Sequence, residues 1–342
     1  LYSSAASDVY KRQALLEALA SNATLTCSVQ QVLVGVKSPK VRARLAANEA
    51  VNIDILRQLL HAPEADVRAA LLRDWWMDSS MELELAQDKD VSVRCAVASK
   101  ARLCKSAQVT LAQDRDETVR SCLLQLDNRE LFILHRLAQE ILAHDSEQFI
   151  REQLAAYPNL TPSVQLILAK DEEVSVREAL ARGHDAWRGE ALCEEAQLYL
   201  SRDEYSSVRL ALAENSRLSH AAQMLLAQDA LASVRLKLVE VSSYQRKLSP
   251  DAQNLLSRDQ DSKVRQALAI QLFGVLVQPS EEDVQLALVS DPDPEVRLAI
   301  LGCLRYGGTR MTDAVKARLL ETLDSDTRQT VEEMFESCEE DN

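Results

Sequence analysis

The chain has 342 residues, of which 46% are hydrophobic and only 4% aromatic, and its formal net charge is −14. An excess of 53 acidic over 39 basic residues argues against the basic face that a nucleic-acid-binding protein presents. No apolar run approaches the roughly 18 residues that span a membrane, so we expect neither nucleic acid nor a membrane as a partner.

The lead segment, residues 1–13, resembles translated adapter sequence at the end of a cloned fragment. We expect it to be non-native or disordered, and it leaves open whether the natural chain extends upstream of residue 14. The alternative is that Asp8–Leu19 forms one more partial helix of the structure that follows.

Residues 14–330 consist of one repeated pattern. Ten times, Val or Ile directly precedes an arginine, a branched apolar residue follows three places later, and leucine stands nine places earlier. The apolar residues on either side of the arginine lie four apart, so they share one face of a helix. The arginines, at intervals of 26 to 32 residues, are Arg42, Arg68, Arg94, Arg120, Arg151, Arg177, Arg209, Arg235, Arg265 and Arg297.

Each repeat is predicted to form two short helices. The first carries Val-Arg-x-x-Leu, and the second ends in Leu-x-x-Asp, as in Leu85–Asp88. No alternating pattern of β-strands competes with this interpretation. A hairpin of about 26 residues cannot bury its apolar stripe alone, so neighbouring hairpins must stack. The predicted fold is therefore all-α, a right-handed α-solenoid (superhelix) of about ten to eleven two-helix repeats in a single domain over residues 14–330.

Eight consecutive arginines also have an aspartate six residues upstream. We expect these residues to form a structural ladder between repeats, each aspartate capping the first helix of the next repeat, rather than an acid–base site. The ladder residues are Asp88, Arg94, Asp114, Arg120, Asp145, Arg151, Asp171, Arg177, Asp203, Arg209, Asp229, Arg235, Asp259, Arg265, Asp291 and Arg297.

Asp-x4-Val-Arg, with the aspartate closing one helix and the arginine early in the next, resembles the signature of HEAT-type repeats. The short period is closer to the leucine-rich repeat variant family of bacterial α-solenoids, and the best single match runs from Ala155 to Asp171. The similarity covers Lys37 to Asp326 and implies an armadillo- or HEAT-like helical scaffold. Some members of that family carry an amino-terminal cysteine cluster that binds iron–sulfur; this chain has no such cluster, so the resemblance implies no cofactor here.

The longer repeats carry about five extra residues, which we place at the turn between their two helices. These stretches are 128–136, 183–193, 241–249 and 273–280. Insertions in solenoids tend to fall on one face, often the binding face. The alternative is that they only lengthen a helix by a turn.

Aromatic residues and a histidine mark the strongest departures from the repeat, and exposed Trp and Tyr commonly anchor protein interfaces. The alternative is that each ring folds back over the stack. The candidate interaction surface consists of Trp75, Trp76, Tyr157, His184, Trp187 and Tyr244.

The carboxyl end is predicted to be a capping helix with an acidic tail over residues 331–342. Glu332 replaces the arginine of the repeat there, after Val331. A terminal repeat has no next neighbour, and a polar outer face keeps it from aggregating.

No catalytic motif stands out. The five histidines lack metal-ligand spacing, and the seven cysteines form no C-x-x-C, an odd and dispersed set that suits a reducing cytoplasm. We therefore expect no catalytic, cofactor-binding or metal-binding residues, and no enzyme activity. The predicted function is a protein-binding scaffold. The alternatives are a HEAT-like repeat enzyme of the alkylpurine DNA glycosylase type, and a redox or metal role through cysteine.

Overall fold

The computed structural model of the chain describes residues 2–72, 77–100, 102–125, 133–183, 191–241, 247–274, 281–304 and 311–340. These residues form 23 helices and no strand. The helices fall into two compact units, residues 1–154 and 155–342, where the sequence predicts one repeat domain over 14–330. The α-solenoid prediction is confirmed at the level of the repeat: two short helices recur in each period.

Unit 1 begins with a helix of 19 residues and continues with short helices, most of them eight residues long. In chain order they are α1 (Tyr2–Ala20), α2 (Cys27–Val34), α3 (Pro39–Ala46), α4 (Ile53–Leu60), α5 (Ala65–Ala69), α6 (Ser79–Ala86), α7 (Val91–Ala98), α8 (Lys105–Ala112), α9 (Glu117–Leu124), α10 (Arg136–Leu142) and α11 (Gln148–Ala155), whose last residue already belongs to unit 2.

Unit 2 continues the same alternation and ends in a longer helix. Its helices are α12 (Pro162–Ala169), α13 (Val174–Arg182), α14 (Glu194–Leu200), α15 (Ser206–Ala213), α16 (His220–Ala227), α17 (Ala232–Glu240), α18 (Pro250–Leu256), α19 (Ser262–Phe273), α20 (Glu282–Val289), α21 (Pro294–Leu304), α22 (Asp313–Glu321) and α23 (Ser325–Glu340).

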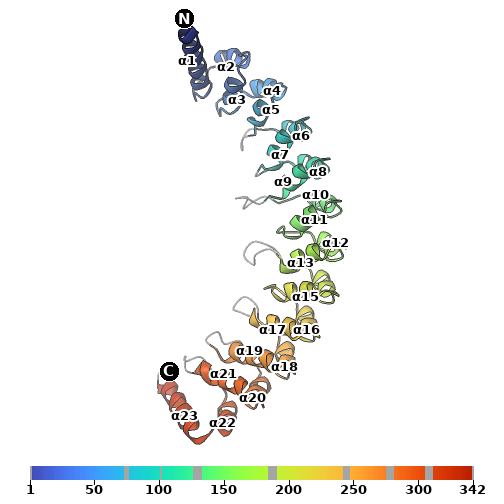
Figure 1. The fold of residues 1–342 in the computed structure, drawn as a ribbon, viewed down its shortest axis with the longest axis vertical. Helices are drawn as coiled ribbons and strands as arrows, with labels where there is room; N and C mark the ends of the chain where they lie inside the picture. The colour runs from blue at the N-terminus through green and yellow to red at the C-terminus, as the bar shows by residue number, and fades with distance from the viewer. Residues whose placement is uncertain are drawn as a thin grey trace. The chain divides into compact units, whose positions relative to one another are not determined.

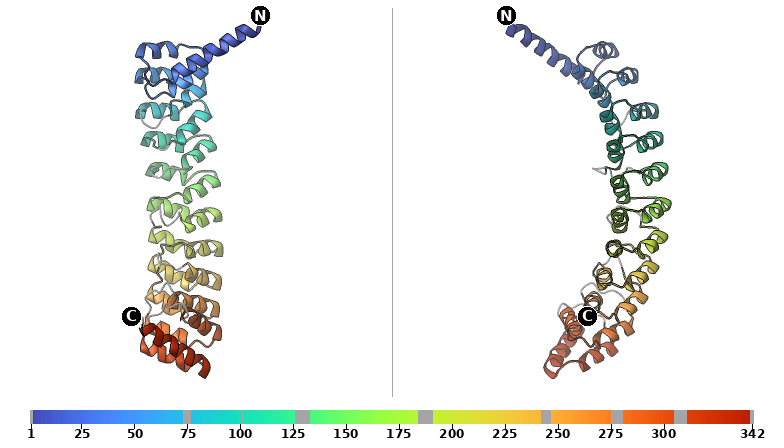
Figure 2. Two further views of the ribbon diagram at one scale, coloured as in Figure 1. Left: turned by 90° about the vertical axis from the view of Figure 1, so that its left-hand side faces the viewer. Right: turned by 45° about the vertical axis from the view of Figure 1, so that its right-hand side comes forward.

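Within each unit the helices form two rows. Odd-numbered helices from α3 to α21 carry Val-Arg-x-x-Leu or Ile-Arg-x-x-Leu and its variants. Within a unit such helices contact their neighbours in the row, as α5 contacts α7 in unit 1 and α13 contacts α15 in unit 2. Even-numbered helices contact one another in the same way, as α12 contacts α14. Figure 1 shows the two rows side by side in unit 2, and Figure 2 shows successive hairpins of each unit stacked one above another.

The apolar stripe of each odd-numbered helix lies in the seam between the rows. Val176 and Leu180 of α13 are fully buried, and so are Val208 and Leu212 of α15. Each such side chain contributes roughly 1.5–3 kcal/mol relative to an exposed one. Cohesion within a unit therefore comes from contacts between adjacent hairpins, as the repeat predicts.

Both ends of the described chain are helical. The helix α1 begins at Tyr2, so it includes most of the lead segment, and it contacts α3; that this segment is non-native stays a prediction. The closing helix α23 begins at Ser325 rather than at residue 331. It begins there because the Asp324 carboxylate accepts the backbone N–H of Thr327 at 2.9 Å, which fixes the helix start six residues earlier.

None of the helices in the described part of the chain combines the length and the hydropathy of a membrane-spanning segment.

Candidate interaction surface

The repeated arginine joins two hairpins. In Arg177, Nε donates to Asp203 Oδ2 at 2.6 Å and Nη2 donates to Asp203 Oδ1 at 3.2 Å. Its Nη1 donates to the backbone carbonyl of Asp171 at 2.7 Å. The aspartate six residues upstream therefore supplies only its backbone oxygen, while the carboxylate comes from the next hairpin.

The same bidentate pair recurs through both units, with Nε to Oδ2 distances of 2.5 to 2.6 Å and side chains at most 15% exposed. The ladder starts one repeat earlier than predicted, at Arg68. The residue six places upstream contributes only its backbone carbonyl, so Ala62 can accept from Arg68 Nη1 as the aspartates of later repeats do. The ladder pairs are Arg68–Asp88, Arg94–Asp114 and Arg120–Asp145 in unit 1, and Arg177–Asp203, Arg209–Asp229, Arg235–Asp259 and Arg265–Asp291 in unit 2.

The ladder aspartate also shapes the turn that follows it, but it does not cap the helix. Asp88 Oδ1 accepts the backbone N–H of Asp90 at 2.8 Å, and Asp90 in turn caps α7 by accepting the N–H of Ser92 at 2.9 Å. The prediction that the repeated aspartate caps the next helix is therefore wrong by two residues. Its carboxylate is already occupied by the arginine and by the turn.

Both partners of the Arg68–Asp88 pair stay ionised. The hydrogen bonds that Arg68 donates to the Asp88 carboxylate raise the pKa of Arg68 above its ordinary value. Burial pushes the pKa of Asp88 upward, but the hydrogen bond from Arg68 and the N–H of Asp90 outweigh it and leave that pKa below 3.8. A carboxylate held in this way neither gives nor takes a proton near neutral pH, so the ladder has the chemistry of a structural element.

A second buried row consists of glutamines, and reasoning from the sequence missed it. Gln197 Nε2 donates to the carbonyl oxygens of Leu192 and Arg217 at 2.7 and 3.1 Å, and its Oε1 accepts the N–H of Ser219 at 2.7 Å. The signal was available, because these glutamines all stand 12 residues before one of the ten repeated arginines. They are 1–9% exposed and comprise Gln30, Gln108, Gln139, Gln165, Gln197, Gln223, Gln253 and Gln285.

The two ends of the hairpins differ in length. The connection from each even-numbered helix to the next odd-numbered one, from α2–α3 to α20–α21, contains four or five residues; we call this the short-turn end. The connection from each odd-numbered helix to the next even-numbered one, from α3–α4 to α21–α22, contains six to eleven residues; we call this the long-loop end. All insertions therefore leave the stack at the same end of their hairpins, as predicted. One repeat also lengthens its helix, since α19 has 12 residues.

Five of the six candidate surface residues, Trp75, Trp76, His184, Trp187 and Tyr244, stand in connections of the long-loop end and lie outside the described residues. The sixth, Tyr157, is also at that end but is only 3% exposed. The expectation of an exposed ring at Tyr157 is wrong: the side chain is buried, which is the alternative that the sequence left open.

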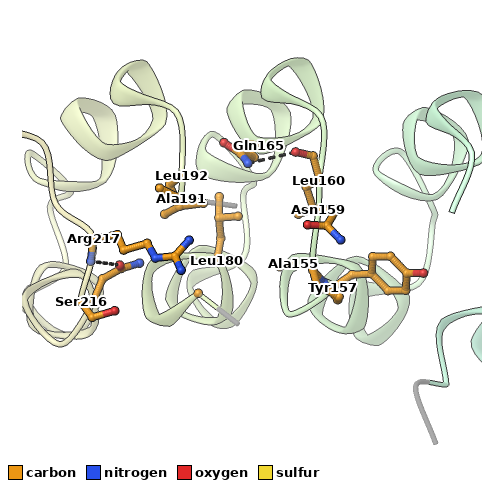
Figure 3. A pocket seen from close by; sticks show the side chains of 13 residues that line it. Ala155, Tyr157, Asn159, Leu160, Gln165, Leu180, Ala191, Leu192, Ser216 and Arg217 are labelled. Carbon is orange, nitrogen blue, oxygen red and sulfur yellow. Dashed lines mark hydrogen bonds between the residues drawn. The ribbon is translucent and has the colours of Figure 1, made fainter. Parts of the chain in front are cut away.

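A small pocket lies at the long-loop end in unit 2 (Figure 3). Its volume is about 30 Å³, and its lining includes Asn159, Gly183, Leu192, Asn215 and Arg217. Asn215 accepts the backbone N–H of Arg217 at 2.9 Å and donates to the carbonyl of Ala181 at 3.2 Å. This space suits one or two water molecules and is far below the roughly 300 Å³ of a typical small-molecule site.

Two unusual backbone conformations border this pocket. Asn159 has a φ of 61° and follows Pro158, as in a type II turn with proline at its first central position. Gly183 ends α13 with φ 67° and ψ 172°, a conformation that is essentially restricted to glycine. A Cβ at Gly183 would lie 2.9 Å from Asn215 Nδ2. The backbone at the end of α13 is therefore fixed by Gly183.

Among the described residues, no group of three or more His, Cys, Asp or Glu side chains is placed to hold a metal ion. Cys95 of α7 is a poor nucleophile, because burial and the hydrogen bond with Cys122 raise the pKa of Cys95 to about 12. Burial also raises the pKa of Cys303. Because the thiolate is the reactive form, these thiols serve as small packing residues.

Among solved structures, the chain is similar to one described as a leucine-rich repeat variant with a novel repetitive protein structural motif. The two share 25% sequence identity, and the alignment covers 79% of this chain and 88% of that chain, with a TM-score of 0.40. No family model and no curated protein matches the chain. The predicted resemblance to the leucine-rich repeat variant family is confirmed, while the α-solenoid assignment itself rests on the helices and contacts described above.

Proposed function

We propose that the chain is a non-catalytic scaffold that binds a protein partner through the long-loop end of its hairpins. One observation supports the proposal: the length of the connections varies at that end, from six to eleven residues, while the short-turn end keeps four or five throughout. A purely structural repeat has no reason to vary one end and hold the other constant. Variable loops on a rigid scaffold are a common arrangement for recognition.

The composition of these loops supports a protein partner. All three tryptophans of the chain, Trp75, Trp76 and Trp187, belong to them, and aromatic residues dominate the energetics of protein interfaces. The net charge of −14 opposes binding to a phosphate backbone. The odd, dispersed set of seven cysteines suits a cytoplasmic protein that needs no cofactor.

The test is affinity capture with the intact chain, compared with the variant Trp75→Ala/Trp76→Ala and with Trp187→Ala. We expect partners captured by the parent to be lost, or their Kd to rise at least roughly tenfold, in one of these variants. A matched control is Lys89→Ala, an exposed residue of the short-turn end, which should leave capture unchanged.

Two results would contradict the proposal. Unchanged binding of a purified partner by all three tryptophan substitutions together would remove the long-loop end as its site. Tight binding of duplex DNA at physiological salt would instead favour the glycosylase-like alternative.

A further inference from the structure

At the short-turn end, two repeats differ from the others in the residue that precedes the odd-numbered helix. This N-cap position, four residues before the repeated arginine, is polar in eight of ten repeats. Asp90, Asp116 and Asp261 show its function, since each carboxylate accepts the backbone N–H two residues on at 2.9 Å. In two consecutive repeats the position is apolar instead, as Tyr205 and Leu231.

Tyr205 and Leu231 contribute no capping bond and are 47% and 43% exposed. Ser38, Glu64 and Glu173 also make no side-chain capping bond, so the residue type is what sets these two repeats apart. Two adjacent repeats present apolar side chains to water where the other eight have a polar residue, which favours a role in contact with another molecule. A third exposed side chain, Tyr199 of α14, is 45% exposed. We name these three residues the short-turn patch.

The patch is held in place by the ladder. The backbone N–H of Tyr205 donates to Asp203 Oδ1 at 3.0 Å, and that of Leu231 donates to Asp229 Oδ1 at 2.9 Å. The Arg177 guanidinium, itself fixed by Asp203, lies 5.6 Å from the centroid of the Tyr205 ring. Lys170 Nζ lies 5.6 Å from the centroid of the Tyr199 ring. Anchors that are ordered before binding lose little conformational entropy on binding.

Acidic residues bracket the patch in the same register. The N-cap position reads Glu173, Tyr205, Leu231 and Asp261 in four consecutive odd-numbered helices, α13 to α19. All four residues use the same turn, with their backbone N–H donating to a ladder aspartate at 2.9 to 3.0 Å. The surface therefore presents acid, apolar, apolar, acid at a spacing of one helix–helix distance, about 8–10 Å.

This spacing selects the conformation of a ligand. A polyproline II chain has three residues per turn and rises about 3.1 Å per residue, so every third side chain lies on one face about 9 Å from the last. We propose that the short-turn patch docks a proline-rich, polyproline II segment of a protein partner, with two apolar side chains three residues apart and a basic residue three places outside each. The inference rests on the proposed scaffold function and adds a second surface at the opposite end of the hairpins.

The probe is a fluorescein-labelled peptide, Lys-Pro-Pro-Leu-Pro-Pro-Leu-Pro-Pro-Lys, titrated into the intact chain and followed by fluorescence anisotropy. The variant Tyr205→Asp/Leu231→Asp installs the residue that other repeats use at this position, so it should fold at least as well as the parent. We expect this variant to weaken binding by roughly thirtyfold. Glu173→Gln/Asp261→Asn should weaken it less and reduce its dependence on salt.

Unchanged affinity in Tyr205→Asp/Leu231→Asp, or no binding of the peptide by the parent, would overturn the proposal. So would preferential binding of a helical peptide that places its leucines seven residues apart. The variant Trp75→Ala/Trp76→Ala separates the two surfaces: it should bind the peptide normally, whether or not it loses its captured partners. Loss of those partners together with absent peptide binding would leave the scaffold function standing and remove the short-turn patch alone.

Discussion

In unit 2, glutamine stands 12 residues before every ladder arginine, from Gln165 to Gln285, whereas unit 1 has Leu56 and Glu82 at two of these positions. Glu82 still accepts a backbone N–H from the next hairpin, that of Cys104, at 2.8 Å. Its other oxygen pairs with Lys100 Nζ at 2.8 Å, and both side chains are at most 10% exposed. A buried ion pair thus replaces the neutral amide.

At this buried position the stack therefore requires polar groups whose hydrogen bonds are satisfied, rather than one residue type. A glutamate cannot donate to a carbonyl as Gln197 does, so the buried negative charge needs a cation of its own. Lys100 stands six residues after Arg94, where the equivalent repeat of unit 2 has Asn215. The substitutions at Glu82 and at Lys100 therefore depend on each other.

The largest expected effect comes from breaking the regular ladder of unit 2. Asp203→Ala leaves the Arg177 guanidinium buried without its carboxylate, which should lower the free energy of unfolding by about 3–5 kcal/mol. Urea unfolding of the intact chain measures the loss, and hydrogen exchange should locate it in α13 and α15.

The matched control in unit 2 is Glu321→Ala, because the Arg318–Glu321 pair has side chains that are 50% and 64% exposed. Its loss should be about 0–1 kcal/mol. Equal losses in the two variants would show that burial of the ladder does not decide its contribution.

The irregular pair of unit 1 should respond differently to single and double changes. Glu82→Gln leaves the Lys100 ammonium buried without its partner and should destabilise the chain, while adding Lys100→Leu should recover part of the loss. A double-mutant cycle on urea unfolding should give a coupling free energy of about 1–3 kcal/mol.

The converse change in unit 2 is Gln223→Glu, which installs a buried carboxylate in a repeat that has Val241, not a lysine, six residues after its arginine Arg235. It should be destabilising by itself. Additive effects of Glu82→Gln and Lys100→Leu would contradict the mutual dependence of the pair.

Two glycines that end helices, one in each unit, should differ in how much an alanine substitution destabilises the chain. Gly183 ends α13 of unit 2 at φ 67°, whereas Gly35 ends α2 of unit 1 at φ −78° with its nearest Cβ contact at 3.6 Å. Gly183→Ala should cost about 1–3 kcal/mol, since alanine is strained there and its Cβ would meet Asn215. Gly35→Ala should be neutral or slightly stabilising in thermal unfolding. A similar Tm for both variants would contradict the requirement for glycine at residue 183.

The smallest effect is expected on the stability of the chain at low pH. Asp78 caps α6 of unit 1, and hydrogen bonds from Ser80 and Met81 lower its pKa from 3.8 to about 2. A folded-state pKa below the unfolded value means that this stabilisation is present above pH 3.8 and is lost as the pH falls through about 2. In unit 2, α16 and α18 are capped by Ser219 and Ser249, which do not titrate there.

We therefore expect Asp78→Ser to reduce the decrease in unfolding midpoint between pH 4 and pH 2. The same pH series on the parent chain provides the reference. An identical pH dependence in parent and variant would remove Asp78 from the acid response.

Local periodicity made most of the fold predictable. Apolar residues four apart on one helix face, such as Val176 and Leu180, predict that this face is buried, because an apolar stripe on a helix packs against a neighbouring element. The insertions were assigned to the correct end of the hairpins for the same reason, since the helices on either side keep their register. The candidate surface was harder: the sequence marks Tyr157 as an aromatic in a turn, but the packing of that turn decides that the ring is buried.

The repeat, the two helices in each hairpin and the apolar seam follow from the amino-acid sequence alone, because they depend on residues close together in the chain. The pairing of the polar residues follows only from the way the hairpins pack. Arg177 pairs with Asp203, 26 residues away, rather than with the Asp171 carboxylate six residues upstream, and Gln197 bridges to Ser219. Such contacts join separate hairpins, and a period gives the spacing of equivalent residues without stating which neighbour each one faces.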